Sequence, residues 1–222
     1  MNIFGTMYEN LKVQLYDVIS GKSQVRFGTI IQAIASYLEK SEETGREVEV
    51  GKHFKKQEEK RLTEYIEEHK LWKSDIDFSQ YVSEGAEQRV YLKDSEHVLK
   101  LNDSIYYATW RDYFYNLILH NFFFPDTAYK LIGFTKENNV LFAAVEQPFV
   151  SISQNTDLMQ VKKFLTANGF ENTRNNDYFN SDLGIILEDL HDENVLTKNG
   201  ILYFIDTVFY LTKEFWETKT DD

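Results

Sequence analysis

The side chains best suited to chemistry in this sequence are three oxygen donors in its C-terminal third. Asp189 and Asn194 are five residues apart, and Asp206 follows twelve residues after Asn194. Carboxylate and amide oxygens are hard ligands, of the kind that Mg²⁺ selects over imidazole or thiolate. Phosphoryl transfer needs magnesium on the phosphates, a nearby cation and an acceptor for the proton of the attacking hydroxyl. The three residues therefore predict a magnesium site, of the kind that phosphoryl transfer needs.

The run from Asp189 to Leu196 supports this interpretation as a motif. It reads Asp-Leu-His-Asp-Glu-Asn-Val-Leu and resembles the catalytic loop Asp-Leu-His-Pro-x-Asn-Val-Leu of aminoglycoside-type phosphotransferases. More loosely, it resembles the Asp-Leu-Lys-Pro-Glu-Asn of protein kinases. The resemblance implies that Asp189 is the catalytic base and that Asn194 and Asp206 bind magnesium. It places His191 near the transferred phosphate.

Lys100 is the cation that this resemblance predicts for the phosphates of ATP. Val98-Leu99-Lys100 resembles the end of the third strand of kinases, whose lysine reaches the α- and β-phosphates. Residues 83–90 stand where kinases have their nucleotide-binding loop, although the segment has a single glycine, Gly85. The other residues expected to contact ATP are apolar walls for adenine and positions of the hinge: Val90, Val98 and Leu196, and Glu146, Gln147 and Phe149.

Five segments together resemble one family: residues 84–91, 120–125, 133–134, 146–150 and 189–196. The family is the small kinase-like domain found in bacterial and phage polyvalent proteins, a predicted Ser/Thr/Tyr-type kinase. The similarity covers roughly residues 60 to 210. It implies ATP and Mg²⁺ as cofactors, with transfer of the γ-phosphoryl group to a hydroxyl of a protein or small molecule. The identity of that acceptor does not follow from the resemblance.

The elements that must position these residues follow from hydrophobic periodicity. Apolar residues at helical spacing predict helices over 27–40, about 52–70, about 106–121 and about 156–168. Short runs rich in Val, Tyr and Leu predict antiparallel strands at 80–82, 88–92 and 97–101, and hairpins of 128–135 with 140–145 and of 194–197 with 202–205. Between them, we expect a polar stretch at 171–180 and a helix or turn at 182–187.

This order of elements predicts an α+β fold, namely a minimal two-lobed protein-kinase-like fold. The small lobe, about 76–146, would contain five antiparallel strands and one helix. A hinge at 146–150 would lead to a reduced helical large lobe at 151–222, with ATP and magnesium between the lobes. Residues 1–58 would form an N-terminal helical extension before the kinase-like domain of 59–222.

Departures from active kinases keep a second interpretation open. Leu187-Glu188 stands where His-Arg or His-Gly usually precedes the base, so the histidine that braces the loop is missing. Sixteen residues follow Asp206, which leaves no room for an activation segment or a peptide-receiving subdomain. The alternative to a catalytic kinase is therefore a nucleotide-binding pseudokinase or an interaction module of a mobile genetic element.

Composition and charge weigh against other classes of function. The net charge of −12 disfavours binding to nucleic acid, which depends on clustered Lys and Arg, and the one basic cluster, 52–56, is followed by Glu58-Glu59. The absence of cysteine excludes disulfides and zinc ribbons and fits a cytoplasmic protein. No apolar run approaches the roughly 20 residues of a membrane helix, and no signal-peptide pattern is present. The charged faces of the N-terminal helices are expected to face solvent, with a protein partner as the alternative.

Overall fold

The computed structural model describes residues 3–43, 52–85 and 88–217. These residues belong to two compact units, one of residues 24–149 and the other of residues 1–23 together with 150–222. Ala86 and Glu87, in the middle of the predicted nucleotide-binding loop, lie outside the described residues.

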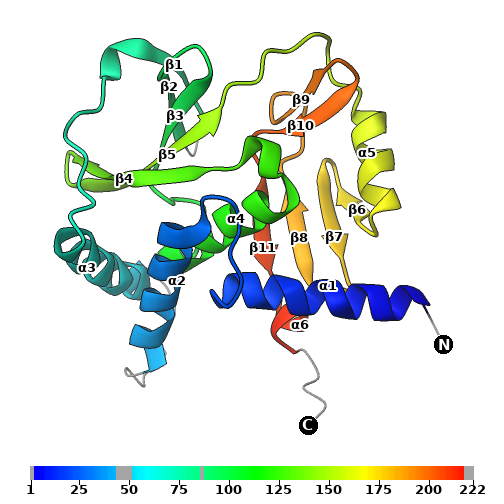
Figure 1. Cartoon of the computed structure of the whole chain (residues 1–222), viewed down its shortest axis with the longest axis horizontal. Coiled ribbons are helices and arrows are strands. Elements are labelled where there is room, and N and C mark those ends of the chain that lie inside the picture. Colours follow the sequence, from blue (N-terminus) through cyan, green and yellow to red (C-terminus); the bar gives the residue numbers. More distant parts are fainter. Residues whose placement is uncertain (1–2, 44–51, 86–87, 218–222) are drawn as a thin grey trace. The chain divides into compact units, whose positions relative to one another are not determined.

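A five-stranded antiparallel sheet is the centre of the unit 24–149 (Figure 1). Its strands are β1 (Tyr81–Glu84), β2 (Gln88–Leu92), β3 (His97–Asn102), β4 (Lys130–Glu137) and β5 (Val140–Pro148), in the spatial order β1-β2-β3-β5-β4. Three α-helices, α2 (Gly28–Glu43), α3 (Lys52–Glu68) and α4 (Trp110–Phe123), and two short 3₁₀ helices, η1 (Phe78–Gln80) and η2 (Pro125–Thr127), complete the described part of this unit. The predicted succession of three strands, a helix and two strands is confirmed.

Helix α4 begins later than predicted because a capping box fixes its first turn. The hydroxyl of Thr109 accepts the N–H of Asp112 at 2.9 Å, and the carboxylate of Asp112 accepts the N–H of Thr109 at 3.1 Å. This reciprocal pair satisfies two of the N–H groups that every helix leaves without a partner at its start. The aromatic residues at 106 and 107 therefore precede the helix.

Helix α3 supplies a second cap for α4 from a distant part of the sequence. The buried carboxylate of Glu58 accepts the N–H groups of Trp110 at 2.5 Å and Arg111 at 3.1 Å. A negative charge is favourable at the positive end of a helix dipole. The ammonium of Lys55 also donates to the carbonyls of Ser104 and Tyr107, at 2.5 and 2.8 Å. Contacts from α3 therefore hold the segment between β3 and α4 and the first turn of α4.

Gly133 lets the segment after α3 join the edge of the sheet. The N–H of Phe134 donates to the carbonyl of Leu71 at 2.9 Å, and the N–H of Lys73 donates to the carbonyl of Phe134 at 2.7 Å. Gly133 lies in an irregularity of β4 with φ +148°, and a Cβ atom there would lie 2.3 Å from the oxygen of Leu71. A residue without a side chain is therefore required at this position.

A buried polar network connects the end of α4 to the start of β4. The amide nitrogen of Asn121 donates to the carbonyls of Arg26 and Tyr129, at 2.9 and 2.8 Å, and its amide oxygen accepts the N–H of Tyr129 at 2.7 Å. The Nε2 atom of the buried His120 lies 3.0 Å from the carbonyl oxygen of Thr127. Buried backbone groups need such partners, which gives the His120-Asn121 pair of the family motif a structural task.

The second unit contains a four-stranded antiparallel sheet in the order β11-β8-β7-β6 and a separate hairpin (Figure 1). The sheet strands are β6 (Glu171–Arg174), β7 (Asp177–Asn180), β8 (Ile185–Glu188) and β11 (Val208–Leu211), and the hairpin strands are β9 (Val195–Lys198) and β10 (Ile201–Phe204). The described helices of this unit are α1 (Ile3–Ile19), α5 (Leu158–Ala167) and α6 (Lys213–Trp216). The helix predicted near 156–168 and the hairpin predicted after Asn194 are confirmed.

Two features of this unit differ from the prediction. The polar stretch 171–180, for which no strand was predicted, forms β6 and β7. The helix or turn predicted at 182–187 is a turn at 181–184, and the strand β8 follows it. The large lobe is therefore not mainly helical, because described residues 150–217 form six strands and two helices. The strands were hidden because β6 is an exposed edge strand of polar residues and β8 is too short for its periodicity to distinguish strand from helix.

Helix α1 belongs to the same compact unit as the C-terminal residues. Tyr8 packs against Gly169, where an added Cβ would lie 2.1 Å from the Tyr8 hydroxyl. The ammonium of Lys12 donates to the backbone carbonyl of Glu214 in α6. Leu15, on the same helix, is fully buried. The N-terminal helices thus divide between the two units, and the domain boundary after residue 58 stays a prediction.

We expect Glu58→Ala to lower the free energy of unfolding by about 2 to 3 kcal/mol, because two N–H groups at the start of α4 lose their charged acceptor. Urea denaturation followed by circular dichroism measures this change. The matched control is Glu64→Ala, the same substitution at an exposed position of α3, which should stay within about 0.5 kcal/mol of wild type. Equal effects of the two substitutions would contradict the capping role.

Candidate active site

The loop between β8 and β9 carries the predicted base and one of the two predicted magnesium ligands. Asp189 follows β8 directly and Asn194 precedes β9 directly. Asp189 has φ +64°, in the left-handed region that residues other than glycine seldom adopt. Leu190 is buried and anchors the loop, whereas the side chain of Asp189 is 56% exposed. The carboxylate is therefore presented at the surface of its unit.

Asn194 brings the three predicted oxygen donors together. Its amide nitrogen donates to the backbone carbonyl of Asp189 at 2.8 Å and to the Asp189 carboxylate at 2.9 Å. Its backbone carbonyl accepts the N–H groups of Ile205 at 2.9 Å and Asp206 at 3.3 Å. Asp189, Asn194 and Asp206 consequently lie in one cluster at the open ends of the β9–β10 hairpin.

The electrostatics of this cluster are those of crowded carboxylates. The pKa of Asp189 is raised, mainly by partial burial and also by the charges of Asp206 and Asp177, while His191 and the hydrogen bond from Asn194 act in the opposite direction. The pKa of the neighbouring Glu188 is raised by burial and by the charges of Asp177 and Asp189. A cation bound here would relieve this repulsion.

Two further side chains complete the surroundings of Asp189. The Nε2 atom of His191 lies 3.4 Å from the Asp189 carboxylate and 3.0 Å from the Asn194 amide nitrogen. The carboxylate of Asp177, on β7, accepts the N–H of Asp189 at 3.2 Å. Sequence reasoning missed Asp177, because it belongs to no motif and falls in the polar stretch for which no strand was predicted.

In the other unit, Lys100 lies on one face of the five-stranded sheet with three of the other residues predicted to contact ATP. Residues opposite each other in antiparallel strands share a face, as do alternate residues of one strand. Val90 pairs with Lys100, and Val98 pairs with Gln147, so all four side chains are on the same face. Lys100 is 4% exposed, and its ammonium lies 5.4 Å from the centre of the Tyr129 ring.

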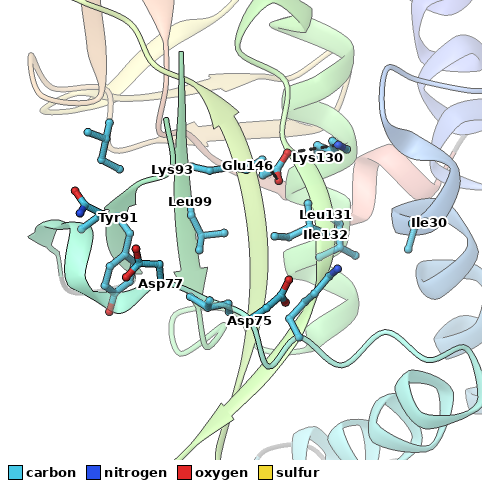
Figure 2. Close-up of a pocket in the computed structure, with 14 residues that line it drawn as sticks. Ile30, Asp75, Asp77, Tyr91, Lys93, Leu99, Lys130, Leu131, Ile132 and Glu146 are labelled. Carbon is cyan, nitrogen blue, oxygen red and sulfur yellow. Dashed lines mark hydrogen bonds and ion pairs between the residues drawn. The ribbon is translucent and has the colours of Figure 1, made fainter. Parts of the chain in front are cut away.

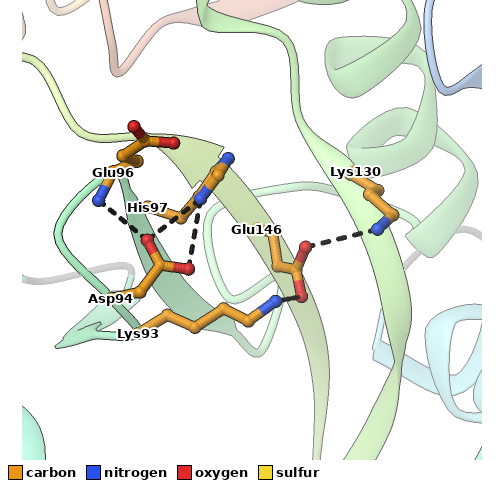
Figure 3. Close-up of polar contacts among 6 residues, drawn as sticks. All are labelled: Lys93, Asp94, Glu96, His97, Lys130 and Glu146. Atoms are coloured by element: carbon orange, nitrogen blue, oxygen red, sulfur yellow. Dashed lines mark hydrogen bonds and ion pairs between the residues drawn. The ribbon is translucent and has the colours of Figure 1, made fainter.

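Glu146, predicted as part of the hinge, has its side chain on the opposite face. It pairs with Leu99 across β3, and Figure 3 shows its carboxylate between the ammonium groups of Lys93 and Lys130. Burial alone would raise the pKa of Glu146, but the hydrogen bond and charge of Lys93 and the charge of Lys130 outweigh it and lower the pKa. The side chain therefore does not share a face with Lys100.

The backbone of the predicted hinge continues the sheet. Strand β5 extends to Pro148, which pairs with His97 of β3. The N–H of Phe149 donates to the carbonyl of Glu96 at 2.7 Å, and Pro148 has no N–H. Neither residue thus offers a backbone donor to adenine, whereas the ring of Phe149 is 49% exposed.

A pocket of about 520 Å³ lies on the face of the sheet that carries Glu146. Figure 2 shows Lys93 and Glu146 on one side and Asp75 and Asp77 on the other, with Leu99 between them. Because side chains alternate along β3, the pocket of Leu99 is on the opposite face from Lys100. The pocket is therefore separate from the face predicted to bind ATP.

Gly85 and Leu196 complete the predicted contacts of ATP. The N–H of Gly85 donates to the carbonyl of Gln88 at 2.9 Å, and this carbonyl oxygen, at 3.9 Å, is the nearest described atom to a Cβ built on Gly85. The glycine is thus not required by the hairpin itself. Leu196 lies on β9, half-buried and opposite Tyr203.

Comparison with known proteins places these features in a family. The sequence model of a family described as Serine/Threonine/Tyrosine kinase found in polyvalent proteins matches residues 55–213. The chain belongs to this kinase family. The match includes both the Lys100 strand and the Asp189 loop, and it confirms the resemblance seen in the sequence. No curated protein and no solved structure matches the chain.

Membership in the kinase family identifies a kinase-like phosphotransferase domain in general terms, and kinases generally use ATP and Mg²⁺.

Within the described segments, no helix is long and apolar enough to cross a membrane.

We expect the free energy of unfolding of this kinase domain to fall in acid because of the buried His120, whose pKa the charge of Lys100 also affects. Burial, with a smaller contribution from the charge of Lys100, lowers the pKa of His120 from 6.5 to about 3. The unfolded chain therefore takes up this proton first, and stability is lost as pH falls below about 6.5. Through this group, lowering the pH from about 7 to about 5 should reduce the free energy of unfolding by about 2 kcal/mol.

Urea denaturation at these two pH values measures the loss, and His120→Gln is the test variant because its amide can still donate to Thr127. The variant should show a smaller loss of stability between the two pH values than the wild type. The same loss in both proteins would contradict the assignment.

Proposed function

We propose that the protein is a kinase that transfers the γ-phosphoryl group of ATP to a hydroxyl in a Mg²⁺-dependent reaction. The observation that carries this proposal is the cluster in which one residue, Asn194, holds the side chain of Asp189 and the backbone of Asp206. Membership in the kinase family supports the same class of reaction. The acceptor would be a protein or a small molecule.

Asp189 is proposed as the base. Its carboxylate would take the proton of the acceptor hydroxyl while the oxygen forms a bond to the γ-phosphorus and the bond to ADP breaks. The raised pKa of Asp189 favours this task, because a stronger base accepts the proton more readily. The hydrogen bond from Asn194 orients the carboxylate.

The donor set near Asp189 fits Mg²⁺. Since the amide nitrogen of Asn194 is directed to Asp189, its amide oxygen is the atom proposed to bind the cation, together with the carboxylate of Asp206. The part of the chain that the structure describes contains no group of three His, Cys, Asp or Glu side chains placed to hold a metal. Phosphate and water oxygens would supply the other ligands, as is usual for Mg²⁺. Bound magnesium would neutralise charge on the phosphates.

The sheet face of Lys100 is proposed to contact ATP. Lys100 would bind the α- and β-phosphates, and the backbone around Gly85 would approach them. Val90 and Val98, on the same face as Lys100, would contact adenine, with Leu196 as a further apolar contact. Gln147 shares that face, whereas Glu146 would act through its backbone and Phe149 through its exposed ring.

The catalytic assignment predicts large and specific effects of two isosteric substitutions. Asp189→Asn should reduce transfer of label from γ-labelled ATP at least about 100-fold, because the base is lost. Asp206→Asn should remove the Mg²⁺-dependent increase in thermal stability that ATP produces. The reactions are run with purified protein, alone and with cell extract, and Asp192→Asn, at an exposed position of the same loop, is the control.

The same measurements distinguish the second interpretation. Stabilisation by ATP and Mg²⁺ without any label transfer in the wild type would indicate a nucleotide-binding module. No stabilisation at all would overturn both nucleotide binding and catalysis.

Gly85→Ala tests whether the backbone of the first hairpin approaches the phosphates. The added Cβ meets no described atom closer than 3.9 Å, so the free energy of unfolding should change by less than about 0.5 kcal/mol. If the backbone contacts ATP closely, affinity for ATP should fall about tenfold, which corresponds to the loss of one hydrogen bond. Isothermal titration calorimetry measures the affinity, and an unchanged value would contradict the contact.

A further inference from the structure

The hairpin of β6 and β7 holds the backbone of Asp189 from outside its own loop. The N–H of Asp189 donates to the carboxylate of Asp177 at 3.2 Å. The N–H of the next residue, Leu190, donates to the backbone carbonyl of Asn176, also at 3.2 Å. The backbone N–H groups of two consecutive loop residues therefore donate to two consecutive residues of the hairpin.

These contacts begin where the sheet ladder stops. Strands β7 and β8 pair from Asn180 with Ile185 to Tyr178 with Leu187, so Asp189 lies beyond the last pair. Its positive φ places it in a region that costs free energy for a residue with a side chain and that persists only where surrounding contacts fix it. The Asp177 carboxylate supplies such a contact at the amide of this residue.

We propose that Asp177 is a positioning residue that sets the backbone, and hence the carboxylate direction, of Asp189. The sequence has Leu187-Glu188 where kinases have the histidine that braces this loop. In this chain, the brace comes from β7, twelve residues before the base. The contribution to catalysis rests on the proposed kinase function, whereas the contact itself does not.

Asp177 could affect Asp189 through its charge as well as through its hydrogen bond, and two substitutions separate these effects. Asp177→Asn keeps an oxygen that accepts the N–H of Asp189 but removes the charge. Asp177→Ala removes both the oxygen and the charge. Asp182→Ala, an exposed acidic residue in the turn between β7 and β8, is the control for a general loss of negative charge.

The experiment measures turnover and backbone protection in the full-length chain. For Asp177→Ala, we expect kcat for phosphoryl transfer to fall about tenfold while KM for ATP stays within about twofold, because the brace acts on the base rather than on nucleotide binding. Amide hydrogen exchange at Asp189, followed by NMR, should become about tenfold faster in Asp177→Ala. Asp177→Asn should keep the exchange rate at Asp189 close to that of the wild type and should lose less kcat than Asp177→Ala, whereas Asp182→Ala should resemble the wild type in both measurements.

The outcomes separate this proposal from the proposed function. Equal losses of kcat in Asp177→Asn and Asp177→Ala would overturn the positioning role, because the charge alone would then explain the effect. Unchanged exchange at Asp189 in Asp177→Ala would overturn it as well. If the wild type shows no turnover, the kinase function fails, and the exchange rates of Asp189 still decide whether Asp177 holds the loop.

Discussion

The hydrogen bonds of Asn194 are the contacts on which the arrangement of the acidic cluster depends. Its side chain holds the carbonyl and carboxylate of Asp189, and its backbone carbonyl receives the N–H groups of Ile205 and Asp206. The residue stands directly before β9, whose first residue pairs with the last residue of β10. The register of the β9–β10 hairpin therefore sets the separation of Asp189 and Asp206, whose carboxylates repel each other. The hydrogen bond from the Asn194 amide offsets part of that repulsion.

In the other unit, the two faces of the five-stranded sheet have different surroundings. One face carries Lys100 and two valines, and the opposite face carries Glu146, its two lysines and a pocket. Strand parity enforces this separation, since a shift of one residue in β3 would exchange Lys100 with Leu99. Hydrogen bonds of Glu58 at the start of α4 and of Asn121 at its end hold this helix in position.

Much of this arrangement follows from the sequence, and the exceptions have physical causes. The hairpin after Asn194 was predictable, because apolar runs flank a turn of Asn and Gly, and the motif around Asp189 indicated the family. The sheet of β6, β7, β8 and β11 was not, since its edge strand is polar and exposed and its buried strands have four residues each. Asp177 was missed for the same reason, and the face of Glu146 depends on a register that composition does not reveal.

The division of the chain has a consequence for how the protein acquires its structure during synthesis. Helix α1 is made before the unit 24–149, whereas the strands and the other described helices of its own compact unit come after residue 149. The intervening unit is continuous in sequence, so all of it has been made before the residues after 149 leave the ribosome. Helix α1, whose buried face includes Leu15, must meanwhile stay without its native partners, which exposes it to aggregation or to chaperones. Of the two units, the one that contains Asp189 is therefore completed after the other.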